Sequence, residues 1–101
     1  MPKERIEHGS LVIDLACHEV QLAGEPLDLT LAEFRLLACL ASRPGRVFPR
    51  GQLVRQITAG DYHVTDRNVD VHIAAIRRKL GDAGMQIATV RGIGYKFRES
   101  G

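Results

Sequence analysis

Residues 65–80 carry apolar side chains at intervals that only an α-helix brings onto one face. The apolar positions are separated by four, three and four residues: Val69, Ile73, Ile76 and Leu80. On a helix they form a single stripe, which must face a core to leave water. The other side carries polar and small groups, namely Asn68, Val71, His72, Ala75, Arg78 and Lys79. The sequence therefore predicts an anchored helix with a second face directed outward, where it could lie in a groove.

Both ends of this helix are marked. Thr65 or Asp66 can cap its N-terminus, because a short side-chain oxygen can accept a hydrogen bond from an unpaired backbone N–H there. The last turn holds three cations, Arg77, Arg78 and Lys79. They favour the negative end of the helix dipole, and Gly81 is placed to end the helix. A basic last turn is also common on solvated surface helices, so this element alone does not identify a function.

Charge is distributed unevenly along a chain of ordinary composition. The 101 residues, 45% of them apolar, suffice for one domain whose core needs neither disulfide nor metal. Residues 1–30 hold two cations against six carboxylates, a balance of −4, whereas residues 67–101 hold seven cations against three carboxylates, a balance of +4. The C-terminal part therefore suits an acidic partner.

The N-terminus bears on location and domain boundaries. Residues 1–9 are polar and contain no apolar run that could be a signal peptide or a membrane span, so we predict a cytoplasmic protein without membrane association. They also lack periodicity, and we assign residues 1–9 to a linker or an expression remnant and residues 10–99 to one domain. Cys17 and Cys39 lie in segments that are predicted as a strand and a helix, and they are expected to be free buried thiols, since no secretion signal accompanies them.

Turn and capping signals predict the first half of the domain. Short alternating stretches between residues 10 and 29, broken by Gly24-Glu25-Pro26, predict three or four antiparallel strands. Thr30 and Glu33 have the spacing of a capping box, which starts a helix at this point. The helix is expected to stop near Ser42, because Pro and Gly follow.

The second half is predicted in the same way. A shorter helix begins at or near Pro49, since proline is tolerated in the first helical turn. A loop over residues 58–64 separates it from the helix at 65–80, and residues 82–84 form another loop. Two strands, 87–90 and 95–98, then flank a turn at 91–94. The predicted fold is α+β, with an N-terminal antiparallel sheet, three helices and a C-terminal β-hairpin.

Two motifs in this order of elements resemble a known family. Residues 67–73 read Arg-Asn-Val-Asp-Val-His-Ile, and residues 89–97 read Thr-Val-Arg-Gly-Ile-Gly-Tyr-Lys-Phe. With the order of elements, they resemble the OmpR/PhoB-type winged helix-turn-helix domain across residues 12–97. The resemblance implies a sequence-specific DNA-binding output domain of a bacterial two-component response regulator, regulating transcription under a phosphorelay. No receiver domain fits in 101 residues, so an excised effector domain or a stand-alone relative is expected.

The outward face of the helix supplies candidate DNA contacts. We expect the recognition helix, residues 65–80, to enter the major groove. The candidates for base contacts are Asn68, Val71, His72 and Ala75. The amide of Asn68 can pair with adenine, and Val71 and Ala75 can meet thymine methyl groups. The candidates for phosphate contacts, which fix register, are Arg67, Arg77, Arg78 and Lys79. The alternative for each is a solvated side chain.

The hairpin and one departure from the family complete the predicted interface. By the resemblance, Thr89 contacts the DNA backbone and Arg91, at the tip of the wing formed by residues 91–94, reaches the adjacent minor groove. Ala74 and Ala75 stand where many relatives carry polar or basic groups, which favours readout of DNA shape. Pro49 replaces a serine cap that is frequent in relatives.

The resemblance also implies partners. The loop at residues 58–64 becomes a candidate contact for RNA polymerase, with a plain connector as the alternative. A monomer is expected in isolation, and a head-to-tail pair on direct-repeat double-stranded DNA. The alternative function is a winged-helix module that binds protein. Such a module would need an apolar outer face on the third helix, against which Arg67, Asn68 and His72 argue.

Signals of catalysis are weak throughout the sequence. The histidines His8, His18, His63 and His72 are scattered without the spacing of metal ligands. No helix follows Gly92-Ile93-Gly94, so these glycines are not expected to form a phosphate loop. No spacing suggests a Ser-His-Asp triad or a carboxylate pair. We therefore predict no enzyme, no cofactor and no metal site.

Overall fold

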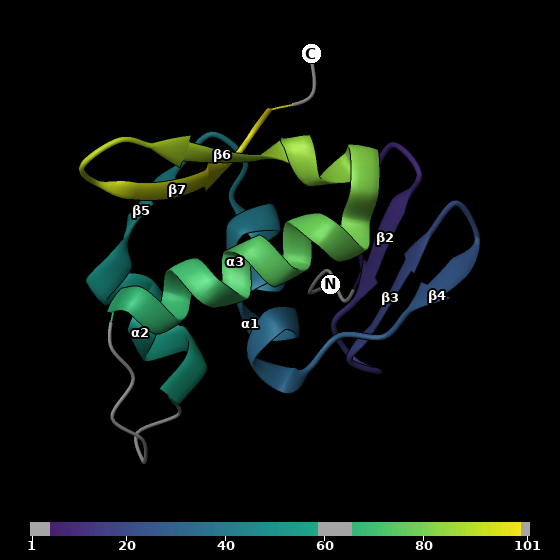
Figure 1. Cartoon of the computed structure of the whole chain (residues 1–101). Coiled ribbons are helices and arrows are strands. Elements are labelled where there is room, and N and C mark those ends of the chain that lie inside the picture. Colours follow the sequence, from purple (N-terminus) through teal and green to yellow (C-terminus); the bar gives the residue numbers. More distant parts are fainter. Residues whose placement is uncertain (1–4, 59–65, 100–101) are drawn as a thin grey trace.

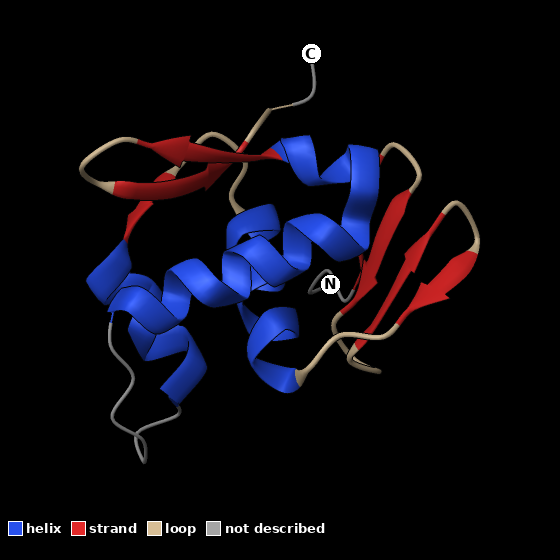
Figure 2. Cartoon of the chain, in the orientation of Figure 1, coloured by secondary structure: helices blue, strands red, loops and turns tan. Residues whose placement is uncertain are grey.

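The chain combines two antiparallel sheets with three α-helices and one 3₁₀ helix across its described residues (Figures 1 and 2). The computed structural model describes residues 5–58 and 66–99, except the side chains of residues 58 and 66–68. The elements in chain order are β1 (Arg5–His8), β2 (Leu11–Asp14), β3 (Glu19–Leu22), β4 (Glu25–Leu27), α1 (Leu31–Ser42), β5 (Val47–Pro49), α2 (Arg50–Thr58), α3 (Asp66–Leu80), η1 (Gly81–Gln86), β6 (Ile87–Val90) and β7 (Gly94–Phe97). The α+β winged-helix architecture predicted from the sequence is confirmed.

The N-terminal sheet has the order β1-β2-β3-β4, with every neighbouring pair antiparallel. Strand β1 lies within the segment 1–9 for which an irregular linker was predicted, so that prediction is wrong for residues 5–8. The strand alternates, with Arg5 and Glu7 exposed and Ile6 and His8 half-buried. Four residues are too short for this alternation to be recognised in a polar sequence, and pairing with β2 decides the conformation.

Helix α1 begins where the capping box predicted. The Thr30 backbone N–H donates to Glu33 Oε1 at 2.9 Å, and the Glu33 N–H donates to Thr30 Oγ1 at 3.2 Å. These two bonds satisfy donors that the first helical turn otherwise leaves unpaired. The helix ends at Ser42, as predicted. Cys39 is half-buried in this helix, whereas Cys17 is exposed in the turn between β2 and β3, so the predicted burial of the thiols is wrong for Cys17.

The predicted start of the second helix at Pro49 needs correction. Residues 47–49 form strand β5, which pairs with β7, and α2 starts at Arg50. The described part of the sheet has the order β5-β7-β6, so β5 is an edge strand, where a proline without an N–H is tolerated. Pro49 is thus the last strand residue before the helix.

The recognition helix predicted at 65–80 is α3, Asp66–Leu80. Its expected cap by Thr65 or Asp66 falls outside the described residues and side chains. Gly81 follows the helix with φ of 61°, a conformation that suits glycine. The loop predicted at 82–84 is instead part of the 3₁₀ helix η1, in which Gly84 packs against the backbone of Arg77.

Helix α3 crosses the middle of the molecule (Figure 1), with the N-terminal sheet at one side and the tip of the β6–β7 hairpin at the other. The core is built from all of these layers. Its fully buried side chains are Leu11, Ile13, Leu36, Leu37, Leu40, Leu53, Val69, Ile73, Ile76, Leu80 and Phe97. The four α3 members are the stripe predicted from spacing, so the buried face of this helix was predicted correctly.

Candidate nucleic-acid interface

The outer side of α3 is open to solvent. Val71 is 60% exposed, Ala74 and Arg78 are exposed, and Ala75 is half-buried. We call these four residues the outer ridge, since they lie opposite the buried stripe on a helix of 3.6 residues per turn. Among the predicted contacts, Arg67 and Asn68 lie in the first turn of α3, but their side chains are outside the described part of the structure.

One flank of α3 is joined to α1 by an ion pair. Lys79 Nζ lies 2.7 Å from Glu33 Oε1, the same oxygen that accepts the Thr30 N–H. Burial alone would raise the pKa of Glu33, but the hydrogen bond from Lys79, the hydrogen bond from the Thr30 N–H and the charge of Lys79 together lower it. Lys79, predicted to contact phosphate, is thus bonded within the protein, and the half-buried His72 belongs to this flank.

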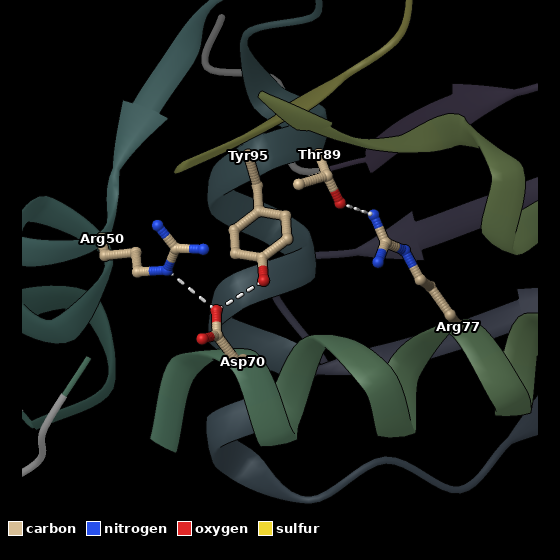
Figure 3. A network of polar contacts seen from close by, with 5 residues as sticks. All are labelled: Arg50, Asp70, Arg77, Thr89 and Tyr95. Atoms are coloured by element: carbon tan, nitrogen blue, oxygen red, sulfur yellow. Dashed lines mark hydrogen bonds and ion pairs between the residues drawn. The ribbon is translucent and has the colours of Figure 1, made fainter. Parts of the chain in front are cut away.

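The other flank of α3 faces the hairpin through Arg77. Its Nη2 donates to the carbonyl oxygen of Ile87 and to Thr89 Oγ1, both at 2.8 Å. Its guanidinium carbon lies 5.5 Å from the centroid of the Tyr95 ring. Arg77 and Thr89, both predicted to contact the DNA backbone, are therefore bonded to each other (Figure 3), although the Thr89 hydroxyl remains exposed and still has a proton to donate.

Asp70 is the centre of a polar network that the sequence did not predict. Its Oδ1 accepts from Arg50 Nε at 2.9 Å and from the Tyr95 hydroxyl at 2.5 Å. Figure 3 shows the Tyr95 side chain between Arg50 and Arg77, and both guanidinium groups lie 5.5 Å from its ring centroid. The network joins the start of α2, the first half of α3 and strand β7.

The charges in this network reinforce each other. The hydrogen bond from Tyr95 lowers the pKa of Asp70, and Arg50 lowers it further against the opposing effect of burial. Burial raises the pKa of Tyr95, as does the hydrogen bond to Asp70. The network is therefore neutral tyrosine, ionised aspartate and charged arginine at neutral pH. Arg50, Asp70 and Tyr95 lie on three different elements, so no local spacing in the sequence indicates this network.

The hairpin presents a cation at its tip. Arg91, Gly92 and Ile93 are exposed, and the turn is closed by the Ile93 N–H, which donates to the Val90 carbonyl at 2.9 Å. Gly92 has φ of 78°, which favours glycine at this point. Arg91 is thus held on a tight turn at the exposed tip of the hairpin.

Most of the negative charge that the sequence shows in residues 1–30 lies on the surface of the protein. The N-terminal sheet and the segment after it expose four carboxylates: Glu7, Glu19, Glu25 and Asp28.

The described part of the chain contains no group of three or more His, Cys, Asp or Glu that could hold a metal ion. Among the same residues, no helix is long and apolar enough to cross a membrane.

Comparisons with known proteins point to one family. The family model described as "Transcriptional regulatory protein, C terminal" matches residues 24–97. The phosphate regulon transcriptional regulatory protein PhoB of Pseudomonas aeruginosa is 40% identical over 93 residues, which cover 91% of this chain and 41% of PhoB. The chain spans about two fifths of the length of the curated relatives it matches.

Solved structures give the same result. The DNA-binding domain of CpxR from E. coli aligns with a TM-score of 0.85 and 32% identity, covering 98% of this chain and 100% of that domain. The Klebsiella pneumoniae RstA DNA-binding domain, solved in complex with RstA box, aligns with a TM-score of 0.81 and 37% identity, covering 95% and 98% of the two chains.

Proposed function

Since this chain belongs to the OmpR/PhoB-type family of C-terminal DNA-binding domains of transcriptional regulatory proteins, we propose that it places α3 in the major groove of a specific DNA site and its wing in the adjacent minor groove. The family consists of DNA-binding transcription regulators and is not a class of enzymes. Its members supply the output of response regulators, which is the function that the sequence predicted for this domain.

One observation carries the proposed binding mode. The inner stripe of α3 is buried, while the outer ridge is exposed over the same turns, and the hairpin that α3 contacts through Arg77 carries Arg91 at its exposed turn. A helix with one anchored and one open face can enter the major groove, and an arginine on a tight turn suits the narrower groove next to it.

We propose distinct roles for the side chains of this surface. Val71 and Ala75 meet thymine methyl groups, while Asn68 pairs with adenine. Arg78, the exposed cation of the outer ridge, contacts phosphate, and Arg67 does so at the other end of the helix. Arg77 and Lys79 act less directly, because each already has a partner within the protein.

The relatives are more than twice as long as this chain, so the control and the assembly of the whole protein are also proposed. We propose that a phosphorylated receiver domain controls this output domain in the cytoplasm. We further propose a monomer in isolation and a head-to-tail pair on direct-repeat DNA. RNA polymerase is the proposed partner of residues 58–64, most of which lie outside the described part of the structure.

A fluorescence titration tests the function. The full chain is titrated with a duplex selected from a random-sequence pool and with a random duplex, at several salt concentrations. Arg78→Ala should weaken both complexes by similar factors and lower the salt slope by about one unit for the lost phosphate contact. Arg5→Ala is the matched control, since it removes the same charge from the exposed edge of the N-terminal sheet.

The base contacts are tested with the same duplexes. Val71→Ala should weaken the selected complex by about 1 to 3 kcal/mol and leave the random complex nearly unchanged. Replacing the contacted thymine by uracil should reproduce that loss in the wild-type protein. A chain that binds neither duplex in a salt-dependent manner would instead favour the protein-binding alternative.

A further inference from the structure

We propose that Asp70, Arg50 and Tyr95 are positioning residues that fix the angle between α3 and the β6–β7 hairpin, so that the outer ridge and Arg91 reach adjacent grooves together. This inference rests on the proposed function. None of the three side chains needs to contact DNA, because their effect passes through the relative placement of two elements that do.

The hairpin is already held on the side of α2. Strand β5 pairs with β7, and the backbone N–H of Arg50 donates to the Ile93 carbonyl at 3.4 Å. Arg50 follows β5 directly, so the start of α2 is joined to the turn end of the hairpin. Helix α3 packs on α1 and α2 and continues through η1 into β6, and side chains add direct bonds between α3 and the hairpin.

Two groups of side chains make that connection. Asp70 joins α3 to Tyr95 and Arg50 near one end, and Arg77 joins it to Ile87 and Thr89 near the other. The two attachment points are seven residues apart, which is about 10 Å along a helix. A single attachment would leave a pivot, whereas two attachments on one flank fix both the distance and the angle (Figure 3).

The sign of the Asp70 charge strengthens this assignment. A carboxylate on a helix that approaches DNA repels phosphate, so its removal should by itself tighten binding slightly. Asp70 is ionised and accepts from two donors on two other elements. If its contribution is positioning, its removal should weaken binding, which is the opposite of the simple electrostatic effect.

The first experiment uses this difference in sign. Binding of the full chain to one duplex, selected on the wild type from a random-sequence pool, is measured for Asp70→Ala and for Asp82→Ala. Asp82 is an exposed carboxylate just beyond the other end of α3 and serves as the matched control. We expect Asp70→Ala to weaken binding roughly tenfold, the scale of one lost charged contact, and Asp82→Ala to leave it unchanged or slightly tighter.

The second experiment is a double-mutant cycle with Tyr95→Phe, which removes one hydroxyl and keeps the ring between the two arginines. In the wild-type background Arg91→Ala should cost roughly tenfold in affinity. In the Tyr95→Phe background it should cost less than about threefold, because a misplaced wing no longer delivers Arg91 to its groove. Arg78→Ala should cost the same in both backgrounds, since the outer ridge does not depend on the wing.

The outcomes separate the possibilities. If the cost of Arg91→Ala is equal in both backgrounds, or if the costs of Arg91→Ala and Arg78→Ala fall together as in a generally loosened domain, the inference is overturned. If Asp70→Ala does not melt cooperatively, that variant is not folded, and the test then uses Tyr95→Phe alone. If the wild-type chain fails to bind the selected pool at all, the proposed function fails, and this inference fails with it.

Discussion

Gly94 offers a sharp test of how the wing is held, because it has no room for a side chain. A Cβ built at this position would lie 2.0 Å from the Phe48 carbonyl oxygen and 3.0 Å from Pro49 Cα. These atoms are backbone atoms of the neighbouring strand β5, so they cannot rotate away as a side chain could. Gly94→Ala should therefore force β5 and β7 apart.

The size of the effect follows from this distance. An ordinary van der Waals contact begins at 3.4 Å, so the strands must separate by about 1.4 Å at this point. Such a shift breaks hydrogen bonds between β5 and β7, which pair over three residue positions, and each lost hydrogen bond costs about 0.5 to 1.5 kcal/mol. Overpacking costs about 1 to 3 kcal/mol in addition. We expect a loss of roughly 2 to 5 kcal/mol, or about 10 to 25 °C in melting temperature.

Two other glycines provide controls for the thermal melt. Gly51 lies in α2 with nothing within 4 Å of the position that a new methyl group would take, so Gly51→Ala should be neutral or stabilise by up to about 1 kcal/mol. Gly92 is equally unobstructed, but its φ of 78° should cost an alanine about 1 to 2 kcal/mol. The reasoning is refuted if Gly94→Ala melts as high as Gly92→Ala, since the clash would then be relieved without separating the strands.

Three further predictions concern the core, acid stability and assembly. Ile73→Asn should abolish cooperative melting, because the lost packing costs about 2 to 5 kcal/mol and the unpaired amide in the core about 2 to 7 kcal/mol more, which together are comparable with a typical total stability of about 5 to 15 kcal/mol. A melt near the wild-type temperature would contradict this. Glu33→Gln should lower the free energy of unfolding at neutral pH and flatten its decline in acid. The lowered pKa of Glu33 stabilises the fold at pH values above the ordinary Glu pKa of about 4.3, and this contribution disappears as the pH falls through the pKa of the folded protein. In melts from pH 7 to pH 2, the same pH dependence in the variant and the wild type would mean that the ion pair is unimportant. Sedimentation should show a monomer without DNA and a second molecule binding only on direct repeats, so a stable free dimer or a preference for inverted repeats would argue against the head-to-tail pair.

The elements predicted best were those with redundant local signals. The Thr30–Glu33 capping box marks the start of α1 twice over, and the apolar stripe of α3 repeats across four positions. Strands β1 and β5 were not predicted, because four and three residues give no usable period and their conformation depends on partners elsewhere in the chain. The Asp70 network was missed for a related reason. Arg50 and Tyr95 are separated from Asp70 by 20 and 25 residues, so only the folded chain brings them together.

The three cations of the last α3 turn show most clearly what local sequence leaves undetermined. Arg77, Arg78 and Lys79 read as one basic cluster, but consecutive residues on a helix point about 100° apart. Arg77 therefore faces the hairpin, Lys79 faces Glu33 on α1, and Arg78 between them is directed outward with the ridge. Because only Arg78 is exposed without a protein partner among the described contacts, it is the cation of this turn whose replacement should affect DNA affinity with least effect on stability. The number of cations in such a turn thus overstates the charge available to a phosphate backbone, and the angle at which each leaves the helix decides its role.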